Sequence, residues 1–268
     1  MALVPFPGSQ AGSAAHALDP DDEEAPGGQM SFLEHLDELR KRIVHALIAV
    51  AVGVVVGFFF INRISDFLLA PTRRVLPAGS KMIYTQPGEA FSFDVQIALI
   101  AGVIFAAPVI FYQVWMFIAP GLYAKEKRLA IPFVVLSTTG FVGGALFNHY
   151  VVFVWMMAFF ASFNSPDLQF LPRLDDTFDL YTKMLLGMGV VFQMPTVIYF
   201  LAKMKLVTWK FLVKNFKYAI LIIFIAAAVI TPSGDMVTQT IFAAPMVGLY
   251  LLGIIIAWIV GPKTKTEG

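Results

Sequence analysis

The chain has 268 residues, 58% of them hydrophobic and 14% charged, and its formal net charge is +1. A soluble domain of this size would carry about 25% charged residues, so the composition predicts that lipid surrounds most of the chain. The nearly neutral charge gives no bias toward nucleic acid. The lack of cysteine excludes disulfides, thiolate catalysis and Cys-ligated metal sites. The four histidines are scattered, so we expect no metal and no other cofactor.

Residues 1–30 are rich in Ala, Gly and Pro and contain an acidic run at 19–24. This segment has neither the basic start nor the apolar run of a secretory signal. We therefore expect a disordered leader over 1–30, a membrane domain over 31–262 and a short tail over 263–268.

A helix needs about 20 apolar residues to span the ~30 Å hydrocarbon layer. Six segments are candidates: 43–61, 93–118, 129–160, 177–202, 216–230 and 236–260. The fifth would reach only about 22 Å at 1.5 Å per residue, so local thinning or tilting has to accommodate it. The sequence thus predicts an all-α polytopic membrane protein with six transmembrane helices.

Six spans place both termini on the same side of the membrane. Thirteen of the 19 Lys and Arg residues fall on that side, so the positive-inside rule predicts that both termini are cytoplasmic. The outer segments 62–90 and 161–176 mix apolar and aromatic residues with prolines such as Pro71. We expect these two loops to pack on one another as an external cap.

The segment 31–43 is amphipathic and leads into the first span from the cytoplasmic interface. Glu38 stands four residues before Arg42, and Asp37 stands four residues before Lys41. This spacing favours ordinary ion pairs along one helix over a binding role for the acids.

Glu126 lies in a short basic loop between the second and third spans. It could stabilise the first turn of the third helix through the helix dipole. It could equally present a carboxylate to a cationic partner, because a carboxylate holds a guanidinium bidentately. Spacing does not decide between these interpretations.

Three polar residues stand out in or beside the later spans. Gln193 lies within the fourth span next to Pro195, where a polar side chain usually faces protein or water; a hydrogen bond between packed helices is the favoured interpretation. Asp235 is placed to cap the last helix, and Gln239 one turn further in is less expected.

The sequence has no phosphate-binding loop, no His-Glu-x-x-His motif and no Gly-x-Ser-x-Gly motif. We therefore expect a protein that is not an enzyme and does not hydrolyse ATP by itself.

Three blocks closely resemble the TatC family, the six-helix core subunit of the twin-arginine protein translocase. They are EHLDELRKR at 34–42, APVIFYQVWMFIAPGLYAKEKR at 107–128, and TPSGDMVTQ at 231–239 followed by APM. The match runs in order from about Phe32 to Val260.

The resemblance implies a bacterial inner-membrane receptor for folded proteins whose signal peptides carry two consecutive arginines. Transport in the family is driven by the proton-motive force. By motif, the signal-peptide site comprises Glu38 and Glu126, with Arg40, Phe117, Leu122 and Tyr123 as neighbours. Asp235 and Gln239 match the region that engages the single-span TatA and TatB subunits, and Pro71 matches the first outer loop. The resemblance also implies association of several copies within the complex.

One residue departs from the family pattern. The family often has Glu within the fourth helix where this chain has Gln193, and glutamine cannot titrate. An intramembrane proton carrier is therefore not expected there, whereas a polar anchor for a partner or for water is. The main alternative is a secondary transporter of a small solute, which needs convergent polar groups at the midplane. A weaker alternative is an intramembrane hydrolase, for which His149 has no evident partner.

Overall fold

The computed structural model describes residues 32–76, 82–118, 130–165, 167, 169–231 and 234–261. In this part of the chain the structure is mainly helical, and Ile83 and Arg173 form an isolated bridge between extended residues. The helices are α1 (Phe32–Phe59), α2 (Ile61–Val75), α3 (Glu89–Ile118), α4 (Ala130–Phe147), the π-helix η3 (Asn148–Val152), α5 (Phe153–Ala161), α6 (Leu174–Val191), α7 (Met194–Lys203), α8 (Trp209–Lys214), α9 (Phe216–Ile230) and α10 (Met236–Val260).

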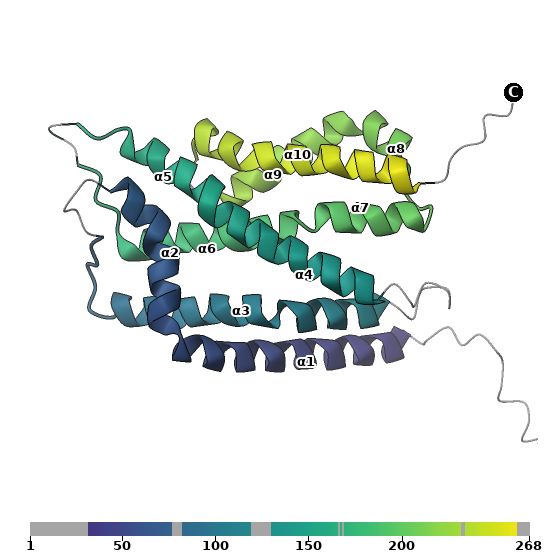
Figure 1. Cartoon of the computed structure of the whole chain (residues 1–268), viewed down its shortest axis with the longest axis horizontal. Coiled ribbons are helices and arrows are strands. Elements are labelled where there is room, and N and C mark those ends of the chain that lie inside the picture. The colour runs from purple at the N-terminus through teal and green to yellow at the C-terminus, as the bar shows by residue number, and fades with distance from the viewer. Residues whose placement is uncertain are drawn as a thin grey trace, which may run out of the picture.

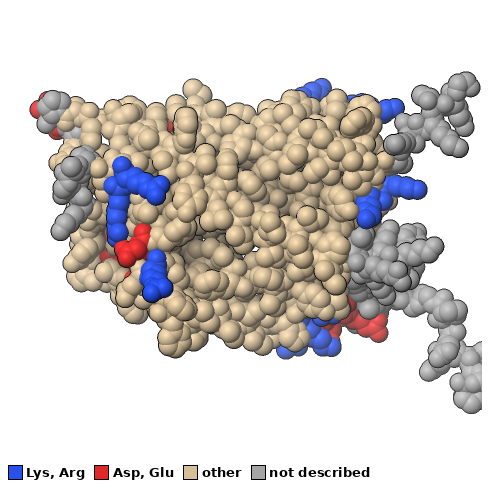
Figure 2. All heavy atoms as spheres, in the orientation of Figure 1, with Lys and Arg blue, Asp and Glu red and all other residues tan. Residues whose placement is uncertain are grey.

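Five helical segments of the described chain are long and apolar enough to span a membrane. They are Leu33–Phe59, Glu89–Ile118, Ala130–Ala161, Leu174–Lys203 and Met236–Val260, and the shorter apolar helix Phe216–Ile230 is the sixth. Charged side chains gather at the two ends of the molecule, and a broad uncharged band lies between them (Figure 2). The prediction of an all-α, multi-pass membrane protein is confirmed. The start of α1 and the end of α10 lie at the same end of the bundle (Figure 1).

Helices α1 and α3 lie side by side along their length (Figure 1). Two glycines make this close approach possible, because a Cβ added at Gly53 would lie 2.6 Å from the carbonyl oxygen of Gly102. A Cβ added at Gly102 would in turn lie 2.6 Å from Cγ2 of Val54. The small-residue contact therefore fixes α1 against α3.

Helix α2 corrects the prediction that residues from 62 onward form a loop. Its apolar residues recur at helical spacing, with Ile61, Ile64 and Leu68 on the side that faces the bundle. Pro71 is buried inside the helix. α2 lies across α3 instead of along it (Figure 1). It therefore runs along one end of the bundle and does not span the membrane.

The two outer segments do pack together, as predicted. Ile83 pairs with Arg173 as an isolated bridge. The N–H of Ile83 donates to the carbonyl oxygen of Pro172 at 3.3 Å, and the N–H of Leu174 donates back to Ile83 at 2.9 Å.

The third and fourth spans are both interrupted. The third continues from α4 through the π-helix η3 into α5. Asn148–Val152 contains no Gly or Pro, so the sequence did not indicate this interruption. The fourth breaks between α6 and α7 at Phe192 and Gln193, just before Pro195 in the first turn of α7. Because proline cannot donate a backbone hydrogen bond, this break is the expected effect of Pro195.

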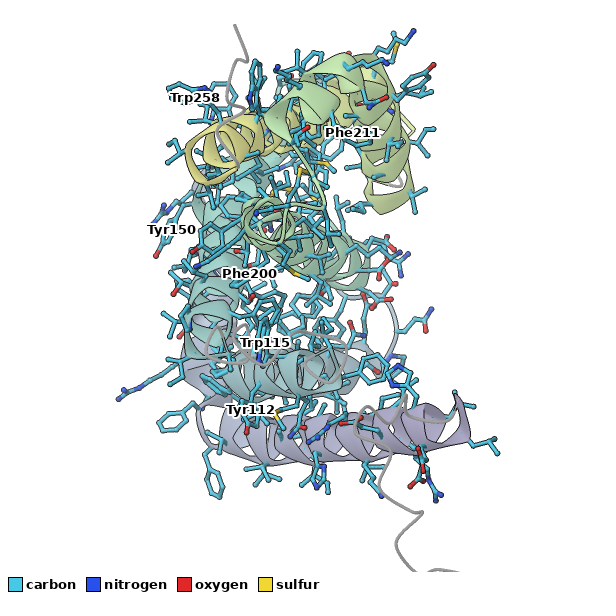
Figure 3. The ribbon with its side chains drawn as sticks, turned by 90° about the vertical axis from the view of Figure 1, so that its right-hand side faces the viewer. Tyr112, Trp115, Tyr150, Phe200, Phe211 and Trp258 are labelled. Carbon is cyan, nitrogen blue, oxygen red and sulfur yellow. The ribbon has the colours of Figure 1, made fainter. Side chains whose placement is uncertain are left out.

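A small aromatic cluster joins α3, α4 and α7 near the end of the bundle where α1 begins. The ring centroids of Trp115 and Phe200 are 5.7 Å apart, and Phe133 lies 5.0 Å from Trp115 and 5.3 Å from Phe200. In Figure 3, which looks onto this end, Trp115 and Phe200 lie in the interior, whereas Trp258 projects outward. The cluster therefore packs the three helices together near the end of the bundle at which Glu38 and Phe117 lie.

Candidate functional site

Glu38 lies on the first turns of α1 and forms an ion pair with Arg42. Nη2 of Arg42 is 3.0 Å from Oε1 of Glu38. The side chains are 17% and 25% exposed, respectively, so solvent screens this pair only partly. The second ion pair, between Lys41 and Asp37 at 2.9 Å, is well exposed. Both i,i+4 pairs predicted from the spacing are confirmed.

The Glu38–Arg42 pair is also connected to α3. Nη1 of Arg42 donates to Oε1 of Gln113 at 3.4 Å. One helical turn further along α3, the ring of Phe117 stacks on His35 with centroids 4.4 Å apart. Phe117 and Glu38, which the sequence assigned to one site, are thus brought to one end of the α1–α3 pair.

One oxygen of Glu38 is not used in these contacts. Oε2 of Glu38 is buried and has no hydrogen-bond partner among the described residues, and the same holds for Nε of Arg42. A buried carboxylate oxygen without a donor is unfavourable by about 1–3 kcal/mol. It therefore favours the approach of a further donor.

The side of α1 around Glu38 is lined by several charged groups. Glu34, Asp37, Glu38, Lys41, Arg42 and His45 surround one shallow depression. The three carboxylates of this depression outnumber its two bases, Lys41 and Arg42, so its surface favours cationic groups. Arg40 is exposed on the same turns of α1 and does not line the depression.

Three residues of the predicted site, Leu122, Tyr123 and Glu126, lie outside the described residues.

Gln193 makes the helix-packing hydrogen bonds that its position favoured. Its Nε2 donates to the carbonyl oxygen of Ser137 in α4 at 2.9 Å and lies 3.3 Å from that of Gly189 in α6. A Cβ added at Gly140 would be 3.5 Å from the same nitrogen, so α4 carries a glycine where Gln193 approaches it. Gln193 therefore joins the interrupted fourth span to the third.

Asp235 and Gln239 both have structural partners. Asp235 caps α10, with its Oδ1 accepting from the N–H of Thr238 at 2.7 Å and its Oδ2 accepting from the Thr238 hydroxyl at 2.6 Å. Nε2 of Gln239 donates to the carbonyl oxygen of Phe224 in α9 at 2.8 Å. The capping prediction is confirmed, and Gln239 ties α10 to the short helix α9.

Three polar contacts were not predicted from the sequence: those of Glu89, of Gln113 and of His149. Glu89 is buried, and its carboxylate accepts from the N–H groups of Thr85 (2.8 Å), Gln86 (3.1 Å) and Asp175 (3.2 Å), which holds the outer cap together. The Pro-Gly turn before Glu89 was the one available signal. Nothing in the sequence indicated the contact of Gln113 with Arg42. The expectation that His149 lacks a partner is wrong, because its Nδ1 lies 2.9 Å from the hydroxyl of Tyr181.

A family model described as Sec-independent protein translocase protein (TatC) matches residues 34–245. This chain belongs to the TatC family. The relative from Desulforapulum autotrophicum is 44% identical over 247 residues, which cover 92% of this chain and 89% of the relative. The relative from Koribacter versatilis is 40% identical over 243 residues, which cover 89% of each protein. Both relatives are named Sec-independent protein translocase protein TatC.

The fold agrees with the same family. A crystal structure of the twin arginine translocase receptor TatC superposes with a TM-score of 0.73 at 34% identity, covering 84% of this chain and 98% of that one. A second TatC crystal structure, in DDM, gives a TM-score of 0.74 at 33% identity. The chain is thus a member of a family of translocase components, and the secondary-transporter alternative gains no support from these matches.

Proposed function

We propose that this protein is the signal-peptide receptor and core subunit of a twin-arginine translocase that exports folded proteins, and that it has no catalytic activity of its own. The observation that carries the proposal is the half-buried Glu38, in a TatC-family chain, with one carboxylate oxygen lacking a donor beside two further acids. A guanidinium is the side-chain cation best matched to such a carboxylate, because it donates two parallel N–H bonds.

Recognition begins when one arginine of the signal peptide reaches Glu38 in the depression on α1. The carboxylate of Glu38 turns its buried Oε2 toward the depression and accepts from the incoming guanidinium, while Arg42 stays bonded to Gln113 on α3. A hydrogen bond to a charged group contributes about 1.5–3 kcal/mol. Glu126 supplies the second carboxylate of the site, with Arg40, Phe117, Leu122 and Tyr123 around the pair. Two such contacts plus burial of the apolar part of the signal peptide suffice for micromolar binding, about −8 kcal/mol.

The proposed orientation puts both termini and this site in the cytoplasm, in the inner membrane of a bacterium. It rests on the larger number of Lys and Arg residues on the side of the membrane where both termini lie, compared with the other side. The domain division into 1–30, 31–262 and 263–268 is part of the same proposal. TatA- and TatB-type single-span subunits would contact the region of Asp235 and Gln239, several copies of this chain would assemble in the complex, and the proton-motive force would drive transport.

Site-specific photo-crosslinking tests the receptor role. A crosslinker at position 126 should capture a precursor bearing Arg-Arg and should capture far less of the same precursor bearing Lys-Lys. Glu38→Lys and Glu126→Lys should each abolish capture, with the crosslinker moved to position 117 in the second case. Asp179→Lys makes the same charge change on the opposite end of the bundle, where Asp179 pairs with Lys183, and serves as the matched control. Capture at the wild-type level by both variants at positions 38 and 126 contradicts the assignment.

A further inference from the structure

A half-open apolar hollow lies between α2, α3, α4 and α6, on a different part of the molecule from Glu38. Its volume is about 180 Å³, and its walls include Phe67, Leu68, Ile104, Leu146 and Leu185. Apart from His149 and Tyr181, which bond to each other, the lining side chains are apolar. An apolar cavity of about 150 Å³ stays dry and binds benzene. This hollow therefore suits an apolar group of that size or larger and is not a water site.

Phe67 stands at the edge of the hollow and connects it to α2. Its ring stacks on His149 with centroids 4.0 Å apart and also meets Tyr150 edge-on at 6.1 Å, while the residue remains 41% exposed. Tyr150 projects from the side of the bundle in Figure 3. The hollow thus opens sideways, toward the surface that faces lipid in a membrane.

The arginines of α2 fall into two groups. Arg73 pairs with Asp66 at 3.0 Å, and both project from one side of the helix. Arg63 and Arg74 are exposed and have no ion pair or hydrogen bond among the described residues. They are four residues before and seven residues after Phe67, so all three share one helical stripe. Two unpaired positive charges therefore stand on either side of the aromatic ring at the opening.

In the space-filling view, charged side chains gather over α2, and the surface beside them toward the middle of the bundle is hollowed and uncharged (Figure 2). Since α2 lies across one end of the bundle, its arginines are at headgroup level and the hollow extends from them into the hydrocarbon layer.

We propose that this face binds one anionic phospholipid, with its phosphate attracted between the two unpaired arginines, which are about 16 Å apart along α2, and part of one acyl chain inserted in the hollow beneath Phe67. The charge at the opening and the apolar lining behind it match the two halves of such a lipid. An apolar side chain from a single-span protein helix would also fit the hollow, but such a helix would leave the two arginines unpaired at the membrane surface.

Native mass spectrometry of the full-length protein tests the proposal, after purification in detergent with equal amounts of phosphatidylglycerol and phosphatidylcholine. The wild type should retain phosphatidylglycerol preferentially. Arg63→Gln and Arg74→Gln should each lower that preference about fivefold, since one arginine near an anionic surface contributes about 1 kcal/mol. Lys183→Gln removes the same charge from the same end of the bundle outside the opening, and should leave the preference unchanged.

A second pair of variants tests the hollow itself. Val142→Phe fills it from α4 and should lower retention of both lipids, whereas Val135→Phe, two turns earlier on the same face and exposed to lipid, should not. A photo-crosslinker at Leu146 should give a lipid adduct in membranes. Absence of any preference for phosphatidylglycerol, its persistence in both arginine variants, or an adduct to another protein helix in place of lipid would overturn the proposal. If Val142→Phe fails to fold, the exposed arginine variants decide the question.

Discussion

Gln193 and Ser137 are joined across the seam between the third and fourth spans by a hydrogen bond of 2.9 Å from the amide nitrogen to the backbone carbonyl oxygen. The donor comes from the break between α6 and α7, and the acceptor is a buried residue of α4. Interhelical hydrogen bonds in membranes contribute about 0.6–2 kcal/mol. Gln193 therefore supplies a donor at this position without a titratable group.

Two substitutions of Gln193 distinguish the role of its hydrogen bond from the role of a titratable group. Gln193→Leu removes the donor and should impair export and lower the midpoint of thermal unfolding in detergent. Gln193→Glu should be tolerated, because a carboxyl group at this depth is protonated and can still donate to Ser137. Val190→Leu, a lipid-exposed change one turn earlier, is the control. Wild-type export by the leucine variant would show that the hydrogen bond has no role in transport.

The contact between α1 and α3 should be sensitive to a single methyl group. Gly102→Ala would place a Cβ 2.6 Å from Val54 and 2.9 Å from its backbone nitrogen, so the two helices must separate. Overpacking of this kind costs about 1–3 kcal/mol. Because the Arg42–Gln113 contact joins the same two helices, capture of a precursor at position 126 should fall together with thermal stability.

Gly143→Ala provides the matched comparison for this prediction, since a Cβ there meets nothing within 4 Å. Equal unfolding midpoints for the Gly102 and Gly143 variants, measured by tryptophan fluorescence in detergent, would contradict the close-packing explanation.

The sequence predicted the spans well because each is a long apolar run with clear ends. The bounds of α9 and α10 agree with the prediction, since polar residues and Thr231 delimit them closely. α2 was missed because its arginines and Pro71 resemble a loop, although its apolar residues have helical spacing. The π-helix at Asn148–Val152 was missed because its cause lies in packing against neighbouring helices and not in a local residue type.

In the candidate site, too, contacts between residues close in sequence were predicted and contacts between distant residues were missed. The Glu38–Arg42 pair follows from a spacing of four along one helix and was predicted. The link from Arg42 to Gln113 joins residues 71 positions apart, so only the packing of α1 on α3 reveals it. The bond from the N–H of Asp175 to Glu89 was missed for the same reason, because these residues are 86 positions apart.

Glu89 should hold the two outer segments, 62–90 and 161–176, in a fixed conformation. Glu89→Ala leaves the N–H groups of Thr85, Gln86 and Asp175 without an acceptor, and each hydrogen bond to a charged group contributes about 1.5–3 kcal/mol. Hydrogen exchange at these three amides should accelerate by at least tenfold. Glu89→Gln keeps one acceptor oxygen and should have an intermediate effect. Unchanged exchange at Asp175 in the alanine variant would show that this carboxylate does not hold the two outer segments together.

Gln239 should matter most for the short helix α9, which at 15 residues is the least able to span the membrane by itself. Its amide reaches the carbonyl oxygen of Phe224 at 2.8 Å, so Gln239→Leu removes a polar contact between α9 and α10 while keeping the side chain similar in size. We expect faster hydrogen exchange in α9 and a loss of about 1 kcal/mol in stability. Thr240→Val is the control, because the hydroxyl of Thr240 bonds to Met236 within α10 itself. If both variants exchange alike in α9, the hairpin is held by apolar packing alone, and any export defect of Gln239→Leu must come from a lost contact with a partner subunit.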